Sequence, residues 1–233
     1  MNGNLYKPLK SELIKVIDES PLIKTFVLVP EQEFSFATGQ FIEVTLDGMG
    51  EAPFTPSSSP LKSDQLEITV MKTGYVTDQM HEMKPGELMG IRGPFGRGYP
   101  VEKFYDKEVL ILGGGCGFAP IRSLLYNLIA ISDKLRKVTL LSGSKTPEDC
   151  IYKPYIEELR SIPKFKVLRC VDVPDEDWDE EVGVVTSLLD CVKVDIKNSV
   201  AVACGPPIMM KFGTLKLLEM GYPEQDIYLS MEK

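Results

Sequence analysis

The sequence predicts an antiparallel β-barrel domain followed by an α/β domain with a doubly wound parallel sheet. Two observations carry this prediction. In the first half, short β-rich runs are broken by clusters of Gly, Pro, Asp and Ser, as in barrels and sandwiches. In the second half, short apolar runs alternate with segments of helical periodicity, which is typical of parallel sheets. A short charged segment, 101–107, separates the two patterns, so we expect domains over residues 1–102 and 103–233.

The strands expected in the first half are rich in β-branched and other apolar residues and are bounded by turn residues. They are Leu13–Ile17, Lys24–Val29, Phe41–Leu46, Leu66–Met71 and Leu88–Arg92. One short helix is expected over Val76–Met83, just after a Gly-Tyr turn. Short strands at this spacing indicate antiparallel pairing, because no long crossover segment separates them.

The second half contains five expected strands, each followed or preceded by a helical segment. The strands are Val109–Leu112, Val138–Leu141, Phe165–Val171, Val200–Cys204 and Ile227–Met231. The helical segments are Pro120–Ile131, Tyr152–Ser161 and Pro207–Met220, and Thr186–Cys191 is expected to open a short helix. Strands that alternate with helices in this way imply a parallel, doubly wound sheet.

Composition excludes several classes of function. The net charge is −8 and no long Lys/Arg run occurs, which argues against nucleic acid or an anionic membrane surface as a partner. The first residues lack the apolar core of a secretory signal, and no run of 18 apolar residues suggests a membrane span. His81 is the only histidine, which argues against a multi-histidine metal centre or a Ser-His-Asp site.

The five cysteines are widely spaced and form no CxxC pair. They are Cys116, Cys150, Cys170, Cys191 and Cys204. An odd number without a framework of spacings predicts reduced thiols in a cytoplasmic protein. The stretch Asp172–Glu181 is strongly acidic; a solvated surface loop is the favoured interpretation and a docking surface for a partner protein is the alternative.

The strongest local motif is a glycine-rich loop directly after the strand Val109–Leu112. It reads Gly113-Gly114-Gly115-Cys116-Gly117-Phe118-Ala119-Pro120. Glycines let the backbone turn tightly and approach a ligand closely, and the following helix presents free N–H groups to a pyrophosphate. The spacing differs from the usual GxGxxG, so a tight strand-to-helix turn without a ligand is the alternative interpretation.

A second motif, Cys204-Gly205-Pro206-Pro207, closes the strand Val200–Cys204 and opens a helix. Pro207 suits a first helical turn. In an open α/β sheet, ligands bind outside the carboxyl ends of the strands, where both motifs are placed. We therefore expect them to face one crevice, although Cys204 alone would also fit as a small buried apolar residue.

A third signal lies in the first half. The segment Pro53-Phe54-Thr55-Pro56-Ser57-Ser58 precedes one expected strand, and Gly74-Tyr75-Val76-Thr77 opens the short helix after it. Small hydroxyl residues and a helix N-terminus suit the phosphate oxygens and ring edges of a flavin. The alternative is an ordinary Ser/Pro-rich turn.

The motifs PFTPSSS, GYVT, GPFG, GGGCGFAPIR and CGPP follow one another in this order. This order resembles the ferredoxin–NADP reductase superfamily across essentially the whole chain. Within it, the sequence is similar to the FAD/NAD(P)-binding subunits of sulfhydrogenase (its gamma subunit), anaerobic sulfite reductase and dihydroorotate dehydrogenase (its electron-transfer subunit). The resemblance implies hydride transfer between NAD(P)H and FAD, and onward transfer of electrons to an iron–sulfur partner subunit.

The resemblance also implies roles for residues of the first half. Pro53, Phe54, Thr55, Pro56, Ser57 and Ser58 would lie along the flavin ring and ribityl chain. Many relatives read Arg-x-Tyr-Ser here; Ala52 replaces the Arg, Phe54 the Tyr and Thr55 the Ser. Phe54 can still cover a ring face, but the Arg contact to the flavin phosphate is lost. Gly74, Val76 and Thr77 match the segment that holds the FAD pyrophosphate.

In the second half, the resemblance implies a dinucleotide loop formed by Gly113, Gly114, Gly115, Cys116, Gly117 and Pro120. Cys204 matches a cysteine near the nicotinamide C4, Gly205 and Pro206 support its turn, and Glu232 lies near the place of a C-terminal acid beside that cysteine. Ser144 and Lys145 stand where NADPH users often place basic residues, but one Lys does not decide between NADH and NADPH. No acidic residue is expected at that strand end, and Asp149 is the nearest aspartate.

The sequence departs from these relatives at its C-terminus. They continue into a cysteine-rich segment that binds a [2Fe–2S] cluster, and the cluster cysteines are absent from this chain. Two alternatives to the electron-transfer subunit therefore stay open. One is a stand-alone flavin or quinone reductase, and the other is a non-catalytic nucleotide-binding docking subunit.

Overall fold

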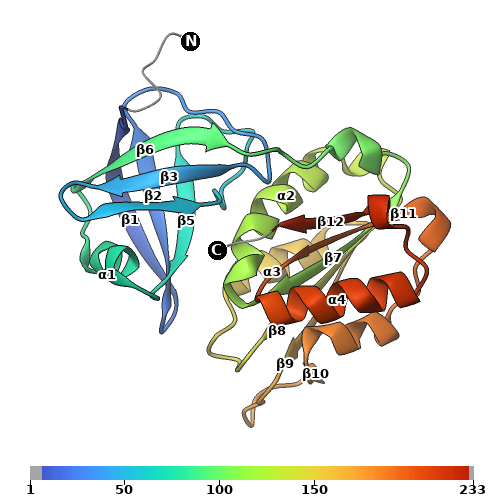
Figure 1. Ribbon diagram of the computed structural model, residues 1–233. Coiled ribbons are helices and arrows are strands. Elements are labelled where there is room, and N and C mark those ends of the chain that lie inside the picture. Colours follow the sequence, from blue (N-terminus) through green and yellow to red (C-terminus); the bar gives the residue numbers. More distant parts are fainter. Residues whose placement is uncertain (1–6, 231–233) are drawn as a thin grey trace. The chain divides into compact units, whose positions relative to one another are not determined.

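The computed structural model describes residues 7–230. The chain divides into two compact units (Figure 1). The first runs to Tyr99 and also takes Arg122–Asn127; the second comprises Pro100–Ile121 and the residues from Leu128 onward. No helix within the described residues is long and apolar enough to cross a membrane.

The first unit is built on one six-stranded antiparallel sheet with a short helix. Its strands are β1 (Leu9–Ser20), β2 (Ile23–Pro30), β3 (Phe41–Leu46), β4 (Gly50–Phe54), β5 (Leu66–Met71) and β6 (Leu88–Phe95), and its helix is α1 (Tyr75–Glu82). They pair in the order β4-β3-β6-β1-β2-β5. Ile42 and Val44 alternate with half-buried residues along β3 and are fully buried in the core. The antiparallel barrel-like fold that the sequence predicts is confirmed.

The segment after β4 brings the two edges of this sheet together. Pro56 forms a bridge to Ile68 of β5, and the Ser57 N–H donates to the Glu67 carbonyl at 2.8 Å. Edge strand β4 is absent from the strands expected from the sequence. It contains Gly50 and Pro53, both poor strand formers, and proline is tolerated in a sheet because the strand lies at an edge.

The second unit has a six-stranded parallel sheet. Its strands are β7 (Glu108–Gly114), β8 (Lys137–Ser144), β9 (Phe165–Val171), β10 (Glu181–Val182), β11 (Ser199–Cys204) and β12 (Ile227–Ser230). The helices are α2 (Phe118–Ala130), α3 (Lys153–Ser161) and α4 (Pro207–Glu219), with short 3₁₀ turns η1 (Val101–Phe104), η2 (Gly115–Gly117), η3 (Ser132–Lys134), η4 (Val185–Cys191), η5 (Ile196–Asn198) and η6 (Glu224–Asp226). The strand order is β10-β9-β8-β7-β11-β12.

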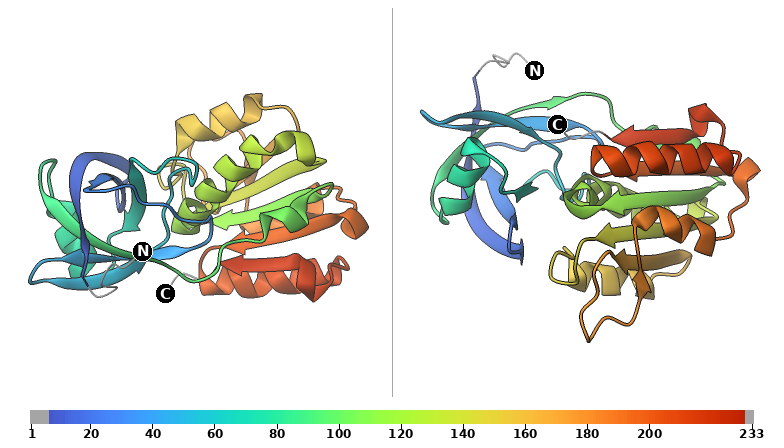
Figure 2. Two further views of the ribbon diagram at one scale, coloured as in Figure 1. Left: turned by 90° about the horizontal axis from the view of Figure 1, so that it is seen from above. Right: turned by 60° about the horizontal axis from the view of Figure 1, so that its bottom comes forward.

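The order of strands reverses next to β7, because the chain adds β8 and β9 on one side of it and β11 and β12 on the other. Right-handed crossovers then place the connecting helices on opposite faces. Figure 2 shows α2 and α3 on one face of the sheet and α4 on the other. The doubly wound parallel sheet that the sequence predicts is therefore confirmed.

Differences between expected and observed elements have local causes. Phe41–Leu46, Leu66–Met71 and Phe165–Val171 agree with the observed strands at both ends. The two-residue strand β10 is not expected from the sequence because it begins at the last residue of the acidic stretch, most of which is an exposed loop. The helix expected over Thr186–Cys191 is the 3₁₀ turn η4.

Candidate functional site

The glycine loop and the Cys-Gly-Pro-Pro turn lie together at the reversal point of the second sheet. Strands β7 and β11 are neighbours, with Gly113 in register with Cys204. A Cβ atom on Gly117 would stand 2.5 Å from the Gly205 Cα, and one on Gly205 would stand 3.1 Å from the Gly114 carbonyl oxygen. The glycines therefore serve close packing of the two turns as well as any approach of a ligand.

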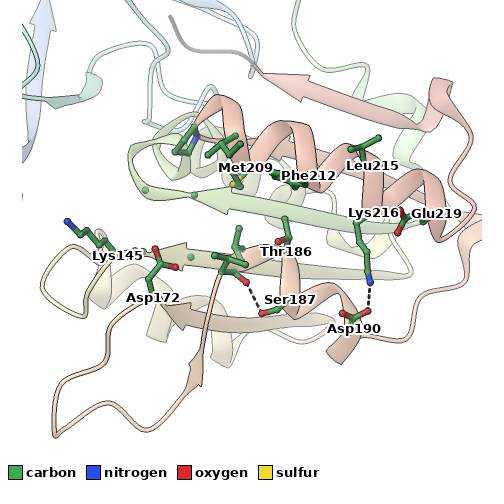
Figure 3. Close-up of a pocket in the computed structure, with 18 residues that line it drawn as sticks. Lys145, Asp172, Thr186, Ser187, Asp190, Met209, Phe212, Leu215, Lys216 and Glu219 are labelled. Carbon is green, nitrogen blue, oxygen red and sulfur yellow. Dashed lines mark hydrogen bonds and ion pairs between the residues drawn. The ribbon is translucent and has the colours of Figure 1, made fainter.

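A cavity of about 930 Å³ opens at this edge of the sheet (Figure 3). Among the residues singled out from the sequence, those that line it are Gly114, Gly115, Ser144, Lys145 and Pro206. Gly115 has a φ of +54°, and a Cβ atom there would have no neighbour within 4 Å. The glycine loop thus has open space above it, as a phosphate-binding loop requires.

The walls of the cavity come from α4 and η4. Met209, Phe212 and Leu215 of α4 supply an apolar wall, and Thr186 and Ser187 of η4 face it (Figure 3). The Lys216 ammonium and the Asp190 carboxylate, also lining residues, form an ion pair at 2.8 Å. An apolar cleft with a few convergent polar groups is the usual form of a cofactor site.

Lys145 and Asp172 stand beside each other at one end of the cavity (Figure 3). The Asp172 N–H donates to the Ser144 carbonyl at 3.1 Å, and the Val173 N–H to the Lys145 carbonyl at 2.9 Å. No acidic residue directly follows β8 in the chain, but the neighbouring strand β9 supplies one at the same edge of the sheet. Asp172 directly follows β9, and carboxyl ends of neighbouring parallel strands share one edge, so the strand prediction itself could have revealed it.

Other residues singled out from the sequence do not line the cavity. They are Gly113, Cys116, Gly117, Pro120, Cys204 and Gly205. The Cys204 side chain is 0% exposed in the strand end. Its place beside a nicotinamide therefore stays a prediction, and Glu232 lies outside the described residues.

In the first unit, two serines of the segment predicted to contact flavin are engaged within the protein. The Ser57 hydroxyl, 0% exposed, shares a hydrogen bond of 3.0 Å with the Thr69 hydroxyl. The Ser58 hydroxyl accepts from the Glu67 N–H at 3.1 Å. These serines hold the segment against β5. Thr55 is half-buried, and its hydroxyl makes no hydrogen bond among the described residues.

The N-terminus of α1 is shaped by Thr77. Its hydroxyl accepts from the N–H groups of Thr73 and Gly74, each at 2.9 Å, and donates to the Gly74 carbonyl. The N–H groups of the first helical turn are left pointing outward, as at any helix start. A Cβ atom on Gly74 would have no neighbour within 4 Å, whereas one on Gly50 would stand 3.2 Å from a Val76 methyl group. The start of β4 and this open helix end are thus side by side, which fits a bound pyrophosphate.

The missing arginine of the flavin segment is not replaced across the sheet. Arg92 of β6 pairs with Glu51 of β4 and lies over the Phe95 ring at 5.7 Å from its centroid. Side chains alternate along a strand, so Glu51 and Ala52 point to opposite faces. Arg92 therefore contacts β4 on the face opposite to the Ala52 side chain.

Comparison with known proteins assigns both units. Residues 11–99 match the oxidoreductase FAD-binding domain family, and residues 111–214 match the oxidoreductase NAD-binding domain family. The chain is 32% identical to sulfhydrogenase 2 subunit gamma of Pyrococcus furiosus, over 99% of this chain and 85% of that protein. It is 33% identical to a probable dihydroorotate dehydrogenase B (NAD(+)), electron transfer subunit, of Methanocaldococcus jannaschii, over 88% of this chain and 71% of that protein.

Solved structures share the fold. A cytochrome P450 reductase of Amycolatopsis superposes with a TM-score of 0.85 at 19% identity, covering 95% of this chain and 68% of that one. The FAD/NAD-binding domain of a nitric oxide dioxygenase from Vibrio cholerae also gives 0.85 at 19% identity, covering 96% and 98%. The chain belongs to the ferredoxin–NADP reductase superfamily of FAD- and NAD-binding oxidoreductases.

Within this superfamily, the chain is a homologue of sulfhydrogenase gamma subunits and dihydroorotate dehydrogenase electron-transfer subunits. It is thus an FAD-dependent NAD(P)H oxidoreductase of the electron-transfer type.

Proposed function

We propose that this chain oxidises NADH through FAD and passes the electrons to an iron–sulfur partner subunit of a redox complex. Residues 1–102 would form the flavin domain and residues 103–233 the nucleotide domain. The observation that carries the choice of donor is the cavity, where Lys145 and Asp172 stand side by side next to the glycine loop. The names of the relatives, which are subunits of sulfhydrogenase and dihydroorotate dehydrogenase, support the place in a complex.

Asp172 favours NADH over NADPH in this proposal. A carboxylate at this edge can accept hydrogen bonds from the ribose hydroxyls of NADH, and it repels the 2′-phosphate of NADPH. Lys145 then serves the pyrophosphate as a point charge. The apolar wall of Met209 and Phe212 covers the less polar parts of the nucleotide and excludes water.

The first unit fits a flavin through four features. When bound, a flavin accepts a hydride from a nicotinamide and releases its electrons singly. The first-turn N–H groups of α1 hold the pyrophosphate, Phe54 covers a ring face, and the Thr55 hydroxyl is available to the ring edge. Ser57 and Ser58 keep this segment in place. Ala52 supplies no charge to the phosphate, so we expect FAD to bind less tightly than in relatives with an arginine there.

The protein positions the two cofactors and sets the polarity around them. No side chain needs to act as a base, because a hydride ion transfers a proton together with both electrons. The single histidine fits this view. His81 lies in α1, buried, with its Nε2 at 3.0 Å from the Val70 carbonyl, and burial lowers the pKa of its imidazole. Five cysteines without a disulfide-type spacing support a reducing compartment, the cytoplasm.

An anaerobic visible spectrum of the purified chain tests the proposal. We expect a flavin spectrum that bleaches with NADH in preference to NADPH, and slow turnover until an iron–sulfur acceptor is added. Fast steady turnover with free flavin or a quinone alone would favour a stand-alone reductase. A colourless protein that stays unresponsive after FAD is added would favour a non-catalytic docking subunit.

A further inference from the structure

Residues 172–183, here named the β9–β10 lobe, form a loop that begins and ends at the nucleotide cavity. The lobe leaves the cavity at Asp172 and returns directly before Val184, and both of these residues line the cavity (Figure 3). Between them the chain is acidic, and Asp175, Glu176 and Asp177 are exposed. The shape of this lobe therefore decides where two cavity-lining side chains stand.

Glu180 differs from the other acids of the lobe, because two arginines from outside the lobe hold it. The Arg169 Nε of β9 donates to one carboxylate oxygen at 2.7 Å, and Arg160 of α3 pairs with the other. The side chains of Glu180 and Arg169 are only 18% and 14% exposed. Charge-assisted hydrogen bonds of this kind, partly removed from water, hold geometry better than exposed ion pairs do.

Trp178 completes this anchor. The Arg169 guanidinium lies 5.1 Å from the centre of the Trp178 ring, and the indole N–H donates to the Glu181 carbonyl at 3.0 Å. Cation–π contact and hydrogen bond together fix the tip of the lobe on β9. We define the lobe anchor as Glu180, Arg160, Arg169 and Trp178.

Away from the lobe anchor, backbone hydrogen bonds join only the two ends of the lobe to neighbouring strands. Strand β10 has two residues, with Glu181 and Val182 in register with Cys170 and Val171. Three further backbone bonds hold the two ends of the lobe: the N–H groups of Asp172 and Val173 donate to the Ser144 and Lys145 carbonyls, and the Gly183 N–H donates to the Val171 carbonyl at 2.9 Å. A two-residue strand forms too few backbone hydrogen bonds to keep its position, so side-chain contacts decide where it lies.

We propose that Glu180 is a positioning residue for nucleotide recognition: held by Arg160 and Arg169, it fixes the β9–β10 lobe so that Asp172 and Val184 stand at the ribose-binding edge. This inference rests on the proposed function, in which Asp172 recognises the ribose of NADH. It assigns a role to an acid that does not itself line the cavity.

The charge state of Glu180 suits this role. Burial raises the pKa of its carboxyl group, but the hydrogen bonds and charges of Arg169 and Arg160 outweigh burial, so the pKa lies below its usual value. The carboxylate therefore stays ionised at neutral pH, where both arginines are charged.

The test compares Glu180→Gln with Glu176→Gln in the FAD-loaded full chain. Both variants remove one negative charge from the same lobe, but only the first breaks the anchor. We expect the KM for NADH to rise about tenfold in Glu180→Gln, as for loss of one charged hydrogen bond, with kcat within about twofold. Glu176→Gln should keep the wild-type KM. Equal KM values in the two variants would overturn the proposal.

Binding of ADP-ribose separates this inference from the proposed function, because it needs no turnover. Trp178 is the only tryptophan, so its fluorescence reports on the lobe directly. We expect a shifted emission and a weaker dissociation constant in Glu180→Gln alone. Arg160→Gln leaves the contact between Arg169 and Glu180 in place, so it should weaken ADP-ribose binding by a smaller factor. This variant replaces Glu180→Gln in the test if Glu180→Gln does not fold. An unchanged dissociation constant in a folded anchor variant would contradict the proposal, whether or not the wild type oxidises NADH.

Discussion

In the α/β unit, two glycine-containing turns come from neighbouring strands and pack directly on each other, whereas in the barrel unit the segment predicted to contact flavin runs along an edge strand and the connection after it. In the first case, topology alone brings the motifs together, because parallel strands end at one edge. In the second, hydrogen bonds from Ser57 and Ser58 hold the segment on a neighbouring strand. The local geometry of these segments therefore depends on glycines in the α/β unit and on hydroxyl groups in the barrel unit.

The largest effect is expected at Gly117. An alanine Cβ there would stand 2.5 Å from the Gly205 Cα, so two backbones must separate. We expect Gly117→Ala to lower the free energy of unfolding by about 2–3 kcal/mol and to weaken NADH binding. Denaturant unfolding measures the first effect and nucleotide titration the second.

Gly74→Ala is the matched control in the barrel unit, where the backbone is extended and a Cβ meets nothing within 4 Å. Its stability should stay within about 0.5 kcal/mol of wild type. Equal losses in the two variants would remove the contrast between the units.

A smaller effect is expected at Asp172. Asp172→Asn keeps the shape of the side chain but removes the negative charge beside Lys145 at the end of the cavity. We expect the KM for NADH to rise about tenfold, and the KM for NADPH to fall, because a 2′-phosphate is no longer repelled. Steady-state kinetics with both donors measures this change.

Asp149→Asn is the control for that prediction. Asp149 is the aspartate nearest to Lys145 along the sequence, but its carboxylate accepts from the Thr146 hydroxyl at 2.7 Å and it does not line the cavity. Its donor preference should match wild type. A switch of preference at Asp149 rather than Asp172 would show that the strand-end acid is wrongly assigned.

The smallest effect is expected in the flavin segment. Ser57→Ala removes one hydroxyl, while Thr69 keeps its hydrogen bond of 2.8 Å with Thr25. We expect a loss of about 1 kcal/mol in unfolding free energy. Thr55→Val should leave stability unchanged but weaken FAD binding, since its hydroxyl has no partner within the described residues. Loss of stability in Thr55→Val, with none in Ser57→Ala, would reverse these roles.

Much of the fold could be predicted from periodicity. The strands Phe41–Leu46, Leu66–Met71 and Phe165–Val171 are bounded by turn residues and rich in β-branched side chains, so their ends agree with the structure. Strand β4 escaped prediction because Gly50 and Pro53 are poor strand formers, and only its place at the sheet edge permits them. The two residues of β10 have no periodicity to detect.

The candidate site was predictable in part. Gly114, Gly115, Ser144, Lys145 and Pro206 follow expected strands and do line the cavity. Asp172 satisfies the same rule, but its acidic neighbours make it indistinguishable by composition from a solvated loop. Phe212 and Leu215 could not be separated from ordinary core residues, because α4 is apolar on both sides and only the completed unit shows which side meets the cavity.

The sequence by itself determined the two fold classes, their order along the chain and the sheet edge at which the glycine motifs meet, because periodicity and strand ends are local properties. Only the tertiary structure decided which glycines serve packing, which serines are satisfied inside the barrel, and which acid of the lobe is held by arginines. Those outcomes depend on residues far apart in the chain, such as Gly117 and Gly205, or Arg160 and Glu180, that meet only when the sheets have formed.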